Sequence, residues 1–545
     1  MPHSAPVPPT GLQALILCGP GVSLNTFTSN PEEYPKCLIP VANRPMLWYA
    51  LDWSKRMGIT DVTLVTPPSS LAPIQAALRQ NPHLTSLPLP SVIAPTDLEM
   101  TTGTAELLRL PEVQNCIKSD FLLLPCDLVC ELPGESLLEA WMVSCGEKDR
   151  RNGLSMYYQT QGREESVKGE ATDFIAVAPL ELNEAPTVSH AAPRSSLTKL
   201  VLSMPMDTLK QKLETDKGFL VRHSLVDAHA QVKLLTTYRD AHIYLLPHWV
   251  KDMARLNENF QSVSEDLVGW WAKSEWQRGL SDKLQISKIF QKKSRRPSHS
   301  DTLGDSESHD GEYPDDESLE DEIDLQSMST TKATPAKFNT AASEPQLASR
   351  VTAPSSPSAK SPMSTLPPML AYIQKDQTPF VRRVDSSAVL LSTSLRLAKL
   401  ESVEEVGKSA SSAFAHAHKV ANTATIAQRC TVTRGDCLVD SNSTIEEKCV
   451  IKETVIGSNC YIASGARLTR CLIMDGAVVG ERCQLTGTIV GRRSKIGRES
   501  VLKDCEVQDG NVVPDDTDAK NEKFMVFEGL DEDDDMDASE EDQDY

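Results

Sequence analysis

The chain has 545 residues, enough for two or three domains that each bury a core of their own. Its formal net charge is −21 and no basic stripe interrupts the acidic balance, which argues against direct, charge-driven binding of nucleic acid. The first residues lack a basic region followed by an apolar core, and no apolar run approaches the ~20 residues that span a bilayer. We therefore expect a cytoplasmic, cytosolic protein without a membrane contact.

Thirteen cysteines could indicate disulfides or a zinc site, but the sequence contains no CxxC pair. The length and the missing signal favour a reducing compartment, where disulfides are rare. We therefore expect neither a structural metal nor a disulfide framework, and we expect no cofactor.

Residues 1–10 are expected to form a flexible N-terminus, and residues 11–285 alternate apolar strands with amphipathic helices. This alternation predicts an α/β doubly wound domain with a mainly parallel sheet. Ligands of such sheets bind at the carboxyl ends of the strands, where Gly19 and Asp127 both fall. In chain order, strands are expected at 12–18, 61–66, 91–95 and 119–127, and helices at 46–58, 71–80 and from 103 to 110.

Residues 286–365 differ in composition from the segments around them. A basic patch (Lys292–Pro297) precedes an acidic block (Asp315–Asp324) and a stretch rich in Ser, Thr, Pro and Ala. Such a segment offers too little apolar surface to offset the entropy of ordering, so we expect a disordered linker. Ordered signals return in a connector over residues 366–425.

A repeat follows the connector. Aliphatic residues recur at spacings of six, six and five, so that each position returns after 17 residues, and a small or short residue lies two positions before each aliphatic. One large and one small inward residue per short strand predicts a three-sided β-helix over residues 426–515. The aliphatics are Val439, Ile445, Ile451, Ile456, Ile462, Leu468, Ile473, Val479, Leu485, Val490, Ile496, Leu502, Val507 and Val513.

Six of the thirteen cysteines occupy the small-residue positions of this repeat, where a free cysteine behaves as a small apolar side chain. Gly457, Gly480, Gly491 and Gly497 directly follow aliphatics, and we expect turns there to use their conformational freedom. From Asp515 to the C-terminus fifteen acidic residues stand against two lysines. The tail over residues 516–545 is therefore expected to be disordered, either as a solvating end or as an acidic docking segment.

The segments ALILCGPG, YPKCLIPVANRPM, TTGTAE and LLLPCD of the first domain resemble sugar-phosphate nucleotidyltransferases. The resemblance implies a Gly-rich loop at Gly19 and Gly21 that grips a triphosphate, and Lys36 near the active site. It also implies that the Gly103 segment packs on the base and that Asp127 binds magnesium. A left-handed β-helix appended to such a domain is a known architecture of this family.

The chain departs from the family pattern at the residues that carry charge. Val22 and Ser23 stand where the family has Thr-Arg, and Pro20 removes a backbone N–H donor from the loop. Asp127 alone is a poor magnesium site without a bound triphosphate. The sequence also lacks a Glu-Lys-Pro segment and a clear Trp-x-Asp-x-Gly. We therefore expect a pseudo-enzyme without catalytic or metal-binding residues.

The five positions Gly19, Gly21, Lys36, Gly103 and Asp127 would then be the remains of a nucleotide pocket. A purely structural role stays open for each of them. The first two glycines could make the turn after the first strand, and the third could open a helix. Lys36 could be solvated, and Asp127 could cap a loop.

Within this superfamily the chain is most similar to the gamma subunits of eukaryotic translation initiation factor 2B. The segment from Glu33 to Val62, the segment YRDAHIYLLPHWV, SVSEDLVGWWAKSEWQ with Gly269 in place of a usual proline, and RRVDSSAVLLSTSLRLAK carry this resemblance. It implies a subunit that pairs with the epsilon subunit and with the alpha, beta and delta regulatory subunits. Such a subunit promotes GDP release from initiation factor 2.

The epsilon subunit carries the exchange activity in a C-terminal helical domain, whereas a tail of only about thirty residues, rich in Asp and Glu, follows the repeat here. The resemblance therefore implies a subunit that does not itself catalyse exchange. Two alternatives remain. The first is a nucleotide-sugar pyrophosphorylase or its non-catalytic regulatory subunit, and the second is an unrelated β-helix scaffold that keeps its first domain for packing.

Overall fold

The computed structural model describes residues 10–19, 23–99, 101–144, 151–180, 196–219, 221–277, 279–286, 288–290, 366–374, 379–408 and 411–525. The expectations for the N-terminus to residue 9, for the linker from 291 to 365 and for the tail from 526 lie outside these residues. All described residues belong to one compact unit, formed by residues 1–291 together with 366–545. No helix in the described part of the chain is long and apolar enough to cross a membrane.

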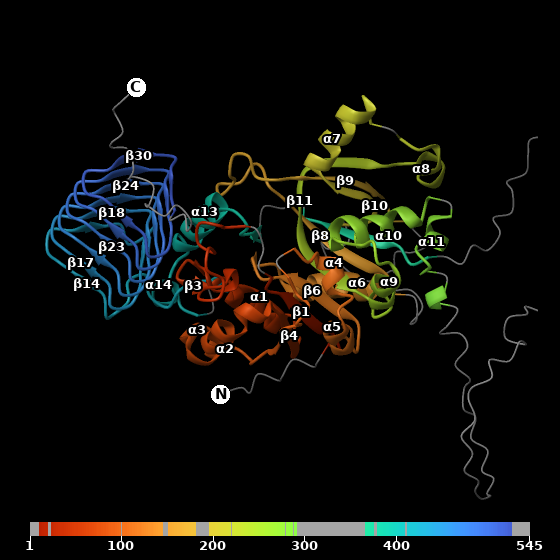
Figure 1. Cartoon of the computed structure of the whole chain (residues 1–545), viewed down its shortest axis with the longest axis horizontal. Coiled ribbons are helices and arrows are strands. Elements are labelled where there is room, and N and C mark those ends of the chain that lie inside the picture. The colour runs from red at the N-terminus through yellow and green to blue at the C-terminus, as the bar shows by residue number, and fades with distance from the viewer. Residues whose placement is uncertain are drawn as a thin grey trace, which may run out of the picture. The chain divides into compact units, whose positions relative to one another are not determined.

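The first domain is built on a nine-stranded sheet with the order β5-β4-β1-β6-β11-β8-β12-β10-β9 (Figure 1). Its first four strands pair in parallel, as the sequence predicts. They are β5 (Ser91–Ile93), β4 (Asp61–Val65), β1 (Gln13–Leu17) and β6 (Phe121–Pro125). The other five are β11 (Lys233–Leu246), β8 (Gly153–Gln159), β12 (Met369–Ile373), β10 (Leu197–Pro205) and β9 (Asp173–Ala178).

The second half of this sheet is mostly antiparallel, which the sequence does not predict. Strand β11 runs antiparallel to β6, β8 and β9, and β10 runs antiparallel to β9 and β12. Apolar patterns reveal that a segment is a strand but not the direction in which it pairs. Strand β12 also comes from the expected connector, so this part of the chain enters the sheet of the first domain, parallel to β8.

Helices cover both faces of the sheet, and two large cores form, one under α1 and one under α9 and α10. The helices expected at 46–58 and 71–80 are observed, and the one expected from residue 103 is a short helix, α4. The helices are α1 (Met46–Arg56), α2 (Leu71–Gln80), α3 (Pro82–Thr85), α4 (Thr104–Leu107), α5 (Pro111–Cys116), α6 (Gly134–Ser144), α7 (Met206–Asp216), α8 (His223–Ala228), α9 (Val250–Leu256), α10 (Gly269–Ser274), α11 (Leu280–Lys283), α13 (Ser387–Ala398) and α14 (Val403–Val406). A π-helix (Val263–Val268) precedes α10, and short 3-10 helices span Lys36–Leu38 and Pro68–Ser70.

Two small antiparallel sheets complete this domain. One joins β2 (Pro40–Val41) to β3 (Arg44–Pro45), and the other joins β7 (Leu128–Cys130) to β13 (Val381–Arg383). The second of these matters for the candidate site, because β7 follows directly after Asp127 and β13 belongs to the expected connector.

The C-terminal domain consists of three six-stranded parallel sheets, the architecture of a left-handed β-helix, and this expectation is confirmed. The first sheet contains β14 (Thr425–Ile426), β17 (Thr444–Ile445), β20 (Tyr461–Ile462), β23 (Val478–Val479), β26 (Lys495–Ile496) and β29 (Val512–Val513). The second contains β15 (Thr431–Val432), β18 (Val450–Lys452), β21 (Arg467–Thr469), β24 (Gln484–Thr486), β27 (Val501–Lys503) and β30 (Asp518–Lys520). The third contains β16 (Leu438–Val439), β19 (Val455–Ile456), β22 (Leu472–Ile473), β25 (Ile489–Val490), β28 (Glu506–Val507) and β31 (Lys523–Phe524).

The interior of the β-helix contains the residues that the repeat predicts. All fourteen predicted aliphatics are buried. The six cysteines of the small-residue positions lie in the same core, and burial raises the pKa of Cys460 to about 12 and that of Cys471 to about 11. The thiols of Cys460 and Cys471 are therefore protonated and unreactive at neutral pH.

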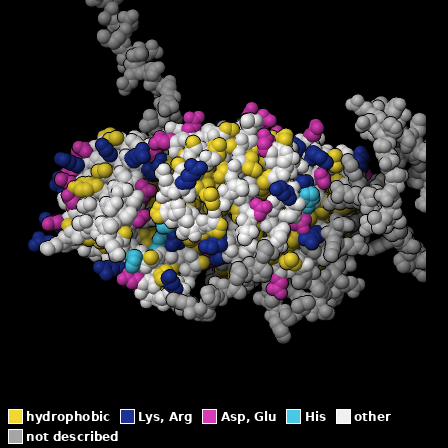
Figure 2. Space-filling view, turned by 90° about the horizontal axis from the view of Figure 1, so that it is seen from below, with side chains coloured by type: hydrophobic (Ala, Val, Ile, Leu, Met, Phe, Trp, Pro, Cys, Tyr) yellow, Lys and Arg dark blue, Asp and Glu magenta, His cyan; other side chains and the backbone are white. Residues whose placement is uncertain are grey.

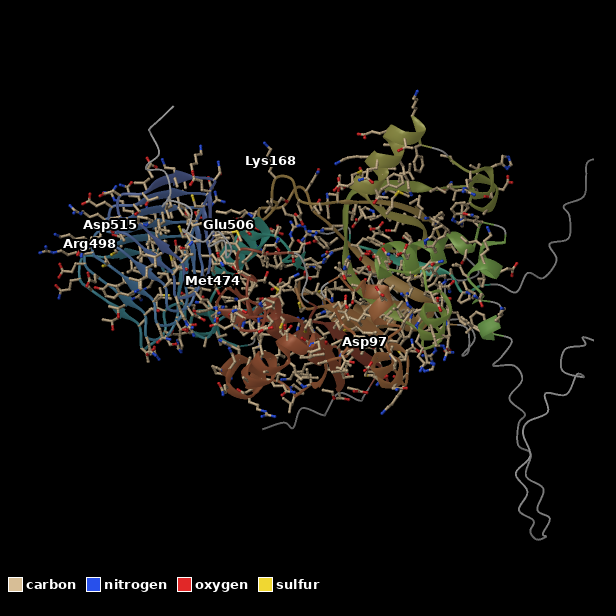
Figure 3. The ribbon with its side chains drawn as sticks, in the orientation of Figure 1. Asp97, Lys168, Met474, Arg498, Glu506 and Asp515 are labelled. Carbon is tan, nitrogen blue, oxygen red and sulfur yellow. The ribbon has the colours of Figure 1, made fainter. Side chains whose placement is uncertain are left out.

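The β-helix extends further than the sequence predicts. Strands β30 and β31 form a last coil to Phe524, whereas the repeat was expected to end at residue 515. After Val513 the spacing of six and five continues at Ala519 and Phe524, but neither residue is aliphatic and large, so a search for aliphatics stops too early. The backbone N–H of Arg498 also donates to Oδ1 of Asp515 at 2.7 Å, and Figure 3 labels both residues.

The four glycines that follow aliphatics do not serve the conformational freedom that the sequence suggests, so this expectation was wrong. Positive φ angles occur instead at Gly465, Gly476 and Gly487. A Cβ on Gly491 would lie 2.6 Å from the backbone N of Asp509, and one on Gly497 would lie 2.4 Å from that of Asp515. Glycine is needed at these positions because successive coils approach closely.

Candidate functional site

The candidate site lies where β1 and β6 end. These strands are parallel neighbours, and the backbone N–H of Cys126 donates to the carbonyl of Leu17 at 3.1 Å. Their carboxyl ends therefore meet, which brings the segment at Cys18 and Gly19 beside the one at Asp127. This is the edge at which open α/β sheets bind ligands.

Lys36 and Asp127 form a buried ion pair at this edge. Lys36 Nζ lies 2.8 Å from Oδ2 of Asp127, and the side chains are only 9% and 3% exposed. Lys36 is placed by the 3-10 helix that follows Pro35. A solvated Lys36, one of the alternatives left open by the sequence, is thereby excluded.

A second cation reaches Asp127 from β13. The backbone N–H of Val384 donates to the carbonyl of Asp127 at 2.8 Å, and Arg383 Nε lies 3.6 Å from Oδ1 of that carboxylate. Burial alone would raise the pKa of Asp127, but the charges of Lys36 and Arg383 outweigh it and hold this pKa well below its usual range. Asp127 is therefore a carboxylate with two cationic partners.

The ion pairs continue away from Asp127 into a buried cluster. Asp385 lies 3.7 Å from Arg383 and accepts a hydrogen bond from Arg239 at 3.2 Å. Arg239 lies 3.6 Å from Glu170, which in turn pairs with Arg382 at 3.2 Å. Acidic and basic side chains alternate along this chain of contacts, so each buried charge has an opposite partner. We call these residues, with Lys36 and Asp127, the ion-pair cluster.

His242 lies at a bulge of β11 that faces the same cluster. The register of β11 against β8 shifts between Asp240 and Tyr244, and His242 adopts a positive φ of 52°. Burial and the charge of Arg383 hold its pKa well below the ordinary value, although Asp127 opposes this shift. The imidazole is therefore neutral at physiological pH.

The three glycines predicted for the nucleotide pocket differ in their surroundings, as far as the structure describes them. Gly19 is half-buried, with open space where a Cβ would lie, and Gly21 falls outside the described residues together with Pro20 and Val22. Gly103 is the N-cap residue of α4, and a Cβ there would lie 2.2 Å from the carbonyl oxygen of Gln261. Gly103 therefore packs against the segment that precedes the π-helix. The structure brings Lys36 and Asp127 together, and it places Gly103 in a separate packing contact.

The segment after the expected phosphate loop contacts the β-helix. Thr26 Oγ1, which is almost fully buried, donates to a carboxylate oxygen of Glu506 at 2.7 Å; Figure 3 labels Glu506. The guanidinium of Arg492 lies over the ring of Tyr34, 3.1 Å from its centroid. Residues between the loop and Lys36 are therefore held by the chain's own C-terminal domain.

Magnesium binds carboxylate oxygens, usually with water and substrate phosphates completing an octahedron. Here Oδ2 of Asp127 is occupied by Lys36, and Arg383 faces Oδ1. The described residues contain no group of three or more His, Cys, Asp or Glu side chains that could hold a metal ion. The residues present at this edge therefore do not fit a magnesium ion, and the arrangement favours buried charge pairing over metal-assisted chemistry.

Comparison with known proteins adds two findings. Residues 433–526 match the family model described as the GMPPB C-terminal domain. A Schizosaccharomyces pombe protein named translation initiation factor eIF2B subunit gamma is 28% identical over 284 residues, 52% of this chain and 56% of that protein. The resemblance to gamma subunits of initiation factor 2B is confirmed.

A Caenorhabditis elegans protein with the same name is 21% identical over 294 residues, which are 54% of this chain and 66% of that protein. The match therefore spans between about half and two thirds of the length of these curated relatives. The match to the C-terminal family model ends at residue 526, close to the last strand of the β-helix.

The sequence does not reveal the residues of the ion-pair cluster that follow the linker. Arg382, Arg383 and Asp385 lie in the segment that the sequence predicts to be a connector, residues 366–425. One signal could have found them: two arginines and an aspartate stand beside apolar Val381 and Val384, and charges within an apolar strand need buried partners. The partner was not predictable, because 256 positions separate Arg383 from Asp127 in the chain and only the pairing of β13 with β7 joins them.

Proposed function

We propose that the chain is a non-catalytic subunit of gamma type in the initiation factor 2B complex, with a degenerate nucleotidyltransferase domain. It would pair with the epsilon subunit, assemble with the alpha, beta and delta subunits, and promote GDP release from initiation factor 2 in the cytosol. The names of the relatives support membership in this complex. The geometry at Asp127 supports the absence of nucleotidyl transfer.

The observation that carries this proposal is the ion pair between Lys36 and Asp127, reinforced by Arg383. Nucleotidyl transfer depends on positioning the phosphates and neutralising their charge. A carboxylate whose charge is already balanced by two protein cations attracts a divalent metal weakly. The loop composition at Pro20 and Ser23 points the same way.

A rigid scaffold role suits the β-helix. Hydrogen bonds between residues 17 positions apart join successive coils. The backbone N–H of Arg492 donates to the carboxylate of Asp509, and that of Ser458 donates to the carboxylate of Asp475. Stacked repeats of this kind present extended, stiff surfaces to other proteins. The face of the molecule in Figure 2 carries Lys, Arg, Asp and Glu interspersed, without a large area of one sign.

One observation favours a second candidate function. The β-helix matches the GMPPB C-terminal domain, and such β-helices also occur in nucleotide-sugar pyrophosphorylases. The chain could therefore be a pyrophosphorylase or its non-catalytic regulatory subunit. The first of these requires a working metal site, which the pairing of Asp127 disfavours.

The experiment that tests the proposal is an activity and binding assay on the full chain. The purified chain is supplied with sugar 1-phosphates, nucleoside triphosphates and magnesium, and pyrophosphate release is measured against an active pyrophosphorylase. We expect no release above the blank, and we expect the chain to co-purify with a co-expressed epsilon subunit. Synthesis of a nucleotide sugar, or failure to bind epsilon, would contradict the proposal.

A further inference from the structure

A groove lies on the first domain away from the ion-pair cluster. It has a volume of about 810 Å³ and lies between β10, α7, α8, α10 and α11, which Figure 1 shows at the same end of the sheet. We call it the basic-rimmed groove. Its lining residues are Leu202, Met204, Leu209, Lys212, Leu213, Gly218, Phe219, Val221, Arg222, Leu225, Trp270, Lys273, Trp276, Gln277, Leu280 and Lys283.

The floor of the groove is a small apolar core of its own. Leu202, Met204 and Trp276 are buried there, and the indole N–H of Trp276 donates to the carbonyl of Val201 at 3.0 Å. This core is separate from the two large cores of the sheet. The floor is therefore fixed in position, as a preformed binding surface should be.

The walls of the groove expose large apolar side chains. Phe219 is 39% exposed, Val221 56% and Trp270 37%. The ring of Phe219 is held edge-on against Phe174, with centroids 5.2 Å apart. Large apolar side chains clustered around a concave surface mark contact sites more often than scattered exposed residues do.

The charged side chains that line the groove are all basic. Lys212, Arg222, Lys273 and Lys283 line it, and none of its lining residues is acidic. Within the described residues none of these four cations forms a salt bridge. The pKa of Lys273 is lowered by burial and by the charges of Lys212 and Arg222, although Asp266 and Glu265, which do not line the groove, oppose this shift. Such a cluster is unusual in a chain with a net charge of −21.

We propose that the basic-rimmed groove docks an acidic helical segment of a partner protein, in which aliphatic or aromatic side chains form one face and Asp and Glu surround it. The apolar side chains would fill the space between Phe219 and Trp270, and the carboxylates would pair with the four cations. A helix that presents apolar anchors at i, i+3, i+4 and i+7 is the usual way to occupy a groove of this kind. The inference does not depend on the proposed function, because it rests on the groove alone.

Nucleic acid fits the groove less well. Single strands follow continuous basic tracks along which bases stack, whereas these cations surround a confined apolar floor. The acidic balance of the whole chain also repels a long polyanion. A short acidic peptide interacts mainly with the four cations that line the groove.

The test uses the full chain and a fluorescein-labelled peptide of about 16 residues, with Leu and Phe at the four anchor positions and Glu or Asp elsewhere. A control peptide carries Gln and Asn in place of the acidic residues. Binding is followed by fluorescence anisotropy at low and at physiological salt. We expect the acidic peptide to bind about tenfold or more tightly than the control, with an affinity that falls as salt rises.

Matched variants locate the site. Lys212→Glu and Lys273→Glu should each weaken the acidic peptide about tenfold, and Phe219→Ser should weaken both peptides. Lys210→Glu is the control, because Lys210 lies on the same helix but pairs with Asp207 and does not line the groove. Thermal unfolding of each variant verifies its fold.

Three results would overturn the proposal. The acidic peptide fails to bind, or Lys210→Glu weakens it as much as Lys212→Glu does. Alternatively, polyuridylate or phosphatidylserine vesicles bind with the same sensitivity to Lys212→Glu and Lys273→Glu, which would assign the groove to another class of ligand.

Discussion

Lys36 Nζ and Asp127 Oδ2 lie 2.8 Å apart, although 91 positions separate the two residues in the chain. The parallel pairing of β1 with β6 creates the edge at which they meet, and β13 adds Arg383 from a segment beyond the linker. A nucleotidyltransferase would need this carboxylate free to hold a metal. In this chain the carboxylate is instead held between two protein cations.

Replacing Lys36 with Met should be strongly destabilising. Asp127 would stay buried with only Arg383 at 3.6 Å, and an uncompensated buried charge costs about 3–5 kcal/mol. Lys36→Met combined with Asp127→Asn should cost less than the sum of the two single changes. The free energy of unfolding, measured with a chemical denaturant, provides both values.

The control for the Lys36 variants is the exposed ion pair between Lys210 and Asp207. Lys210→Met should cost less than about 0.5 kcal/mol, because solvent screens exposed ion pairs. A Lys36→Met chain as stable as the Lys210→Met chain would mean that the buried pair contributes little.

The close approach of β-helix coils makes Gly491 intolerant of a side chain. Gly491→Ala should destabilise the chain by about 1–3 kcal/mol, because the new Cβ would lie 2.6 Å from the backbone N of Asp509. Gly435→Ala is the matched control, since nothing lies within 4 Å of its Cβ position. Thermal unfolding compares the two, and equal midpoints would refute the steric argument.

The β-helix was predictable because its signal is local and repeated. One aliphatic and one small residue per short strand, such as Ile473 and Cys471, specify the interior without knowledge of distant contacts. The last coil escaped prediction because Ala519 and Phe524 replace the aliphatics. The pattern therefore predicts the architecture better than its boundary.

The candidate site was predictable only in part. The alternation of strands and helices places Asp127 at the carboxyl edge of the sheet, and the family resemblance implies that Lys36 lies near the active site. Arg383 and Arg239 could not be placed, because they reach the site through β13 and the long antiparallel strand β11. Strand direction and long-range pairing leave no periodic signal in the sequence.

Asp240 should make stability depend on pH. Burial and the neighbouring carboxylate of Asp173 raise its pKa to about 7, against about 3.9 in an unfolded chain. The folded chain therefore keeps this proton between about pH 4 and 7, and its stabilising contribution is lost as the pH rises through that window. The stability of the wild type relative to Asp240→Asn should fall by up to about 1.4 kcal/mol per pH unit there.

In the Asn variant Oδ1 still accepts from the backbone N–H of His242, and Nδ2 replaces the oxygen that accepts from Tyr244 Oη and can donate to that hydroxyl instead. The variant therefore fills the same space with a group that does not ionise. Denaturant unfolding of both chains at several pH values measures the difference. A difference that stays constant from pH 4 to 7 would show that Asp240 titrates normally.

The thiols of the β-helix should resist modification. Burial raises the pKa of Cys460 to about 12 and protects the other interior cysteines from solvent. Among the cysteines that the structure describes, peptide-resolved mass spectrometry after brief treatment with a thiol reagent should find the half-buried Cys116 and Cys430 modified first. Interior cysteines should react only in denaturant, and rapid labelling of Cys460 in the folded chain would contradict the stacked core.

The rate of GDP release from initiation factor 2 tests the central claim most directly. It is measured with the chain alone, with an epsilon-type subunit alone, and with both together. We predict that the chain alone leaves the spontaneous rate of GDP release unchanged. The chain and epsilon together should release GDP faster than epsilon alone. Exchange catalysed by the chain by itself, or no gain over epsilon, would contradict the assignment of a non-catalytic gamma-type subunit.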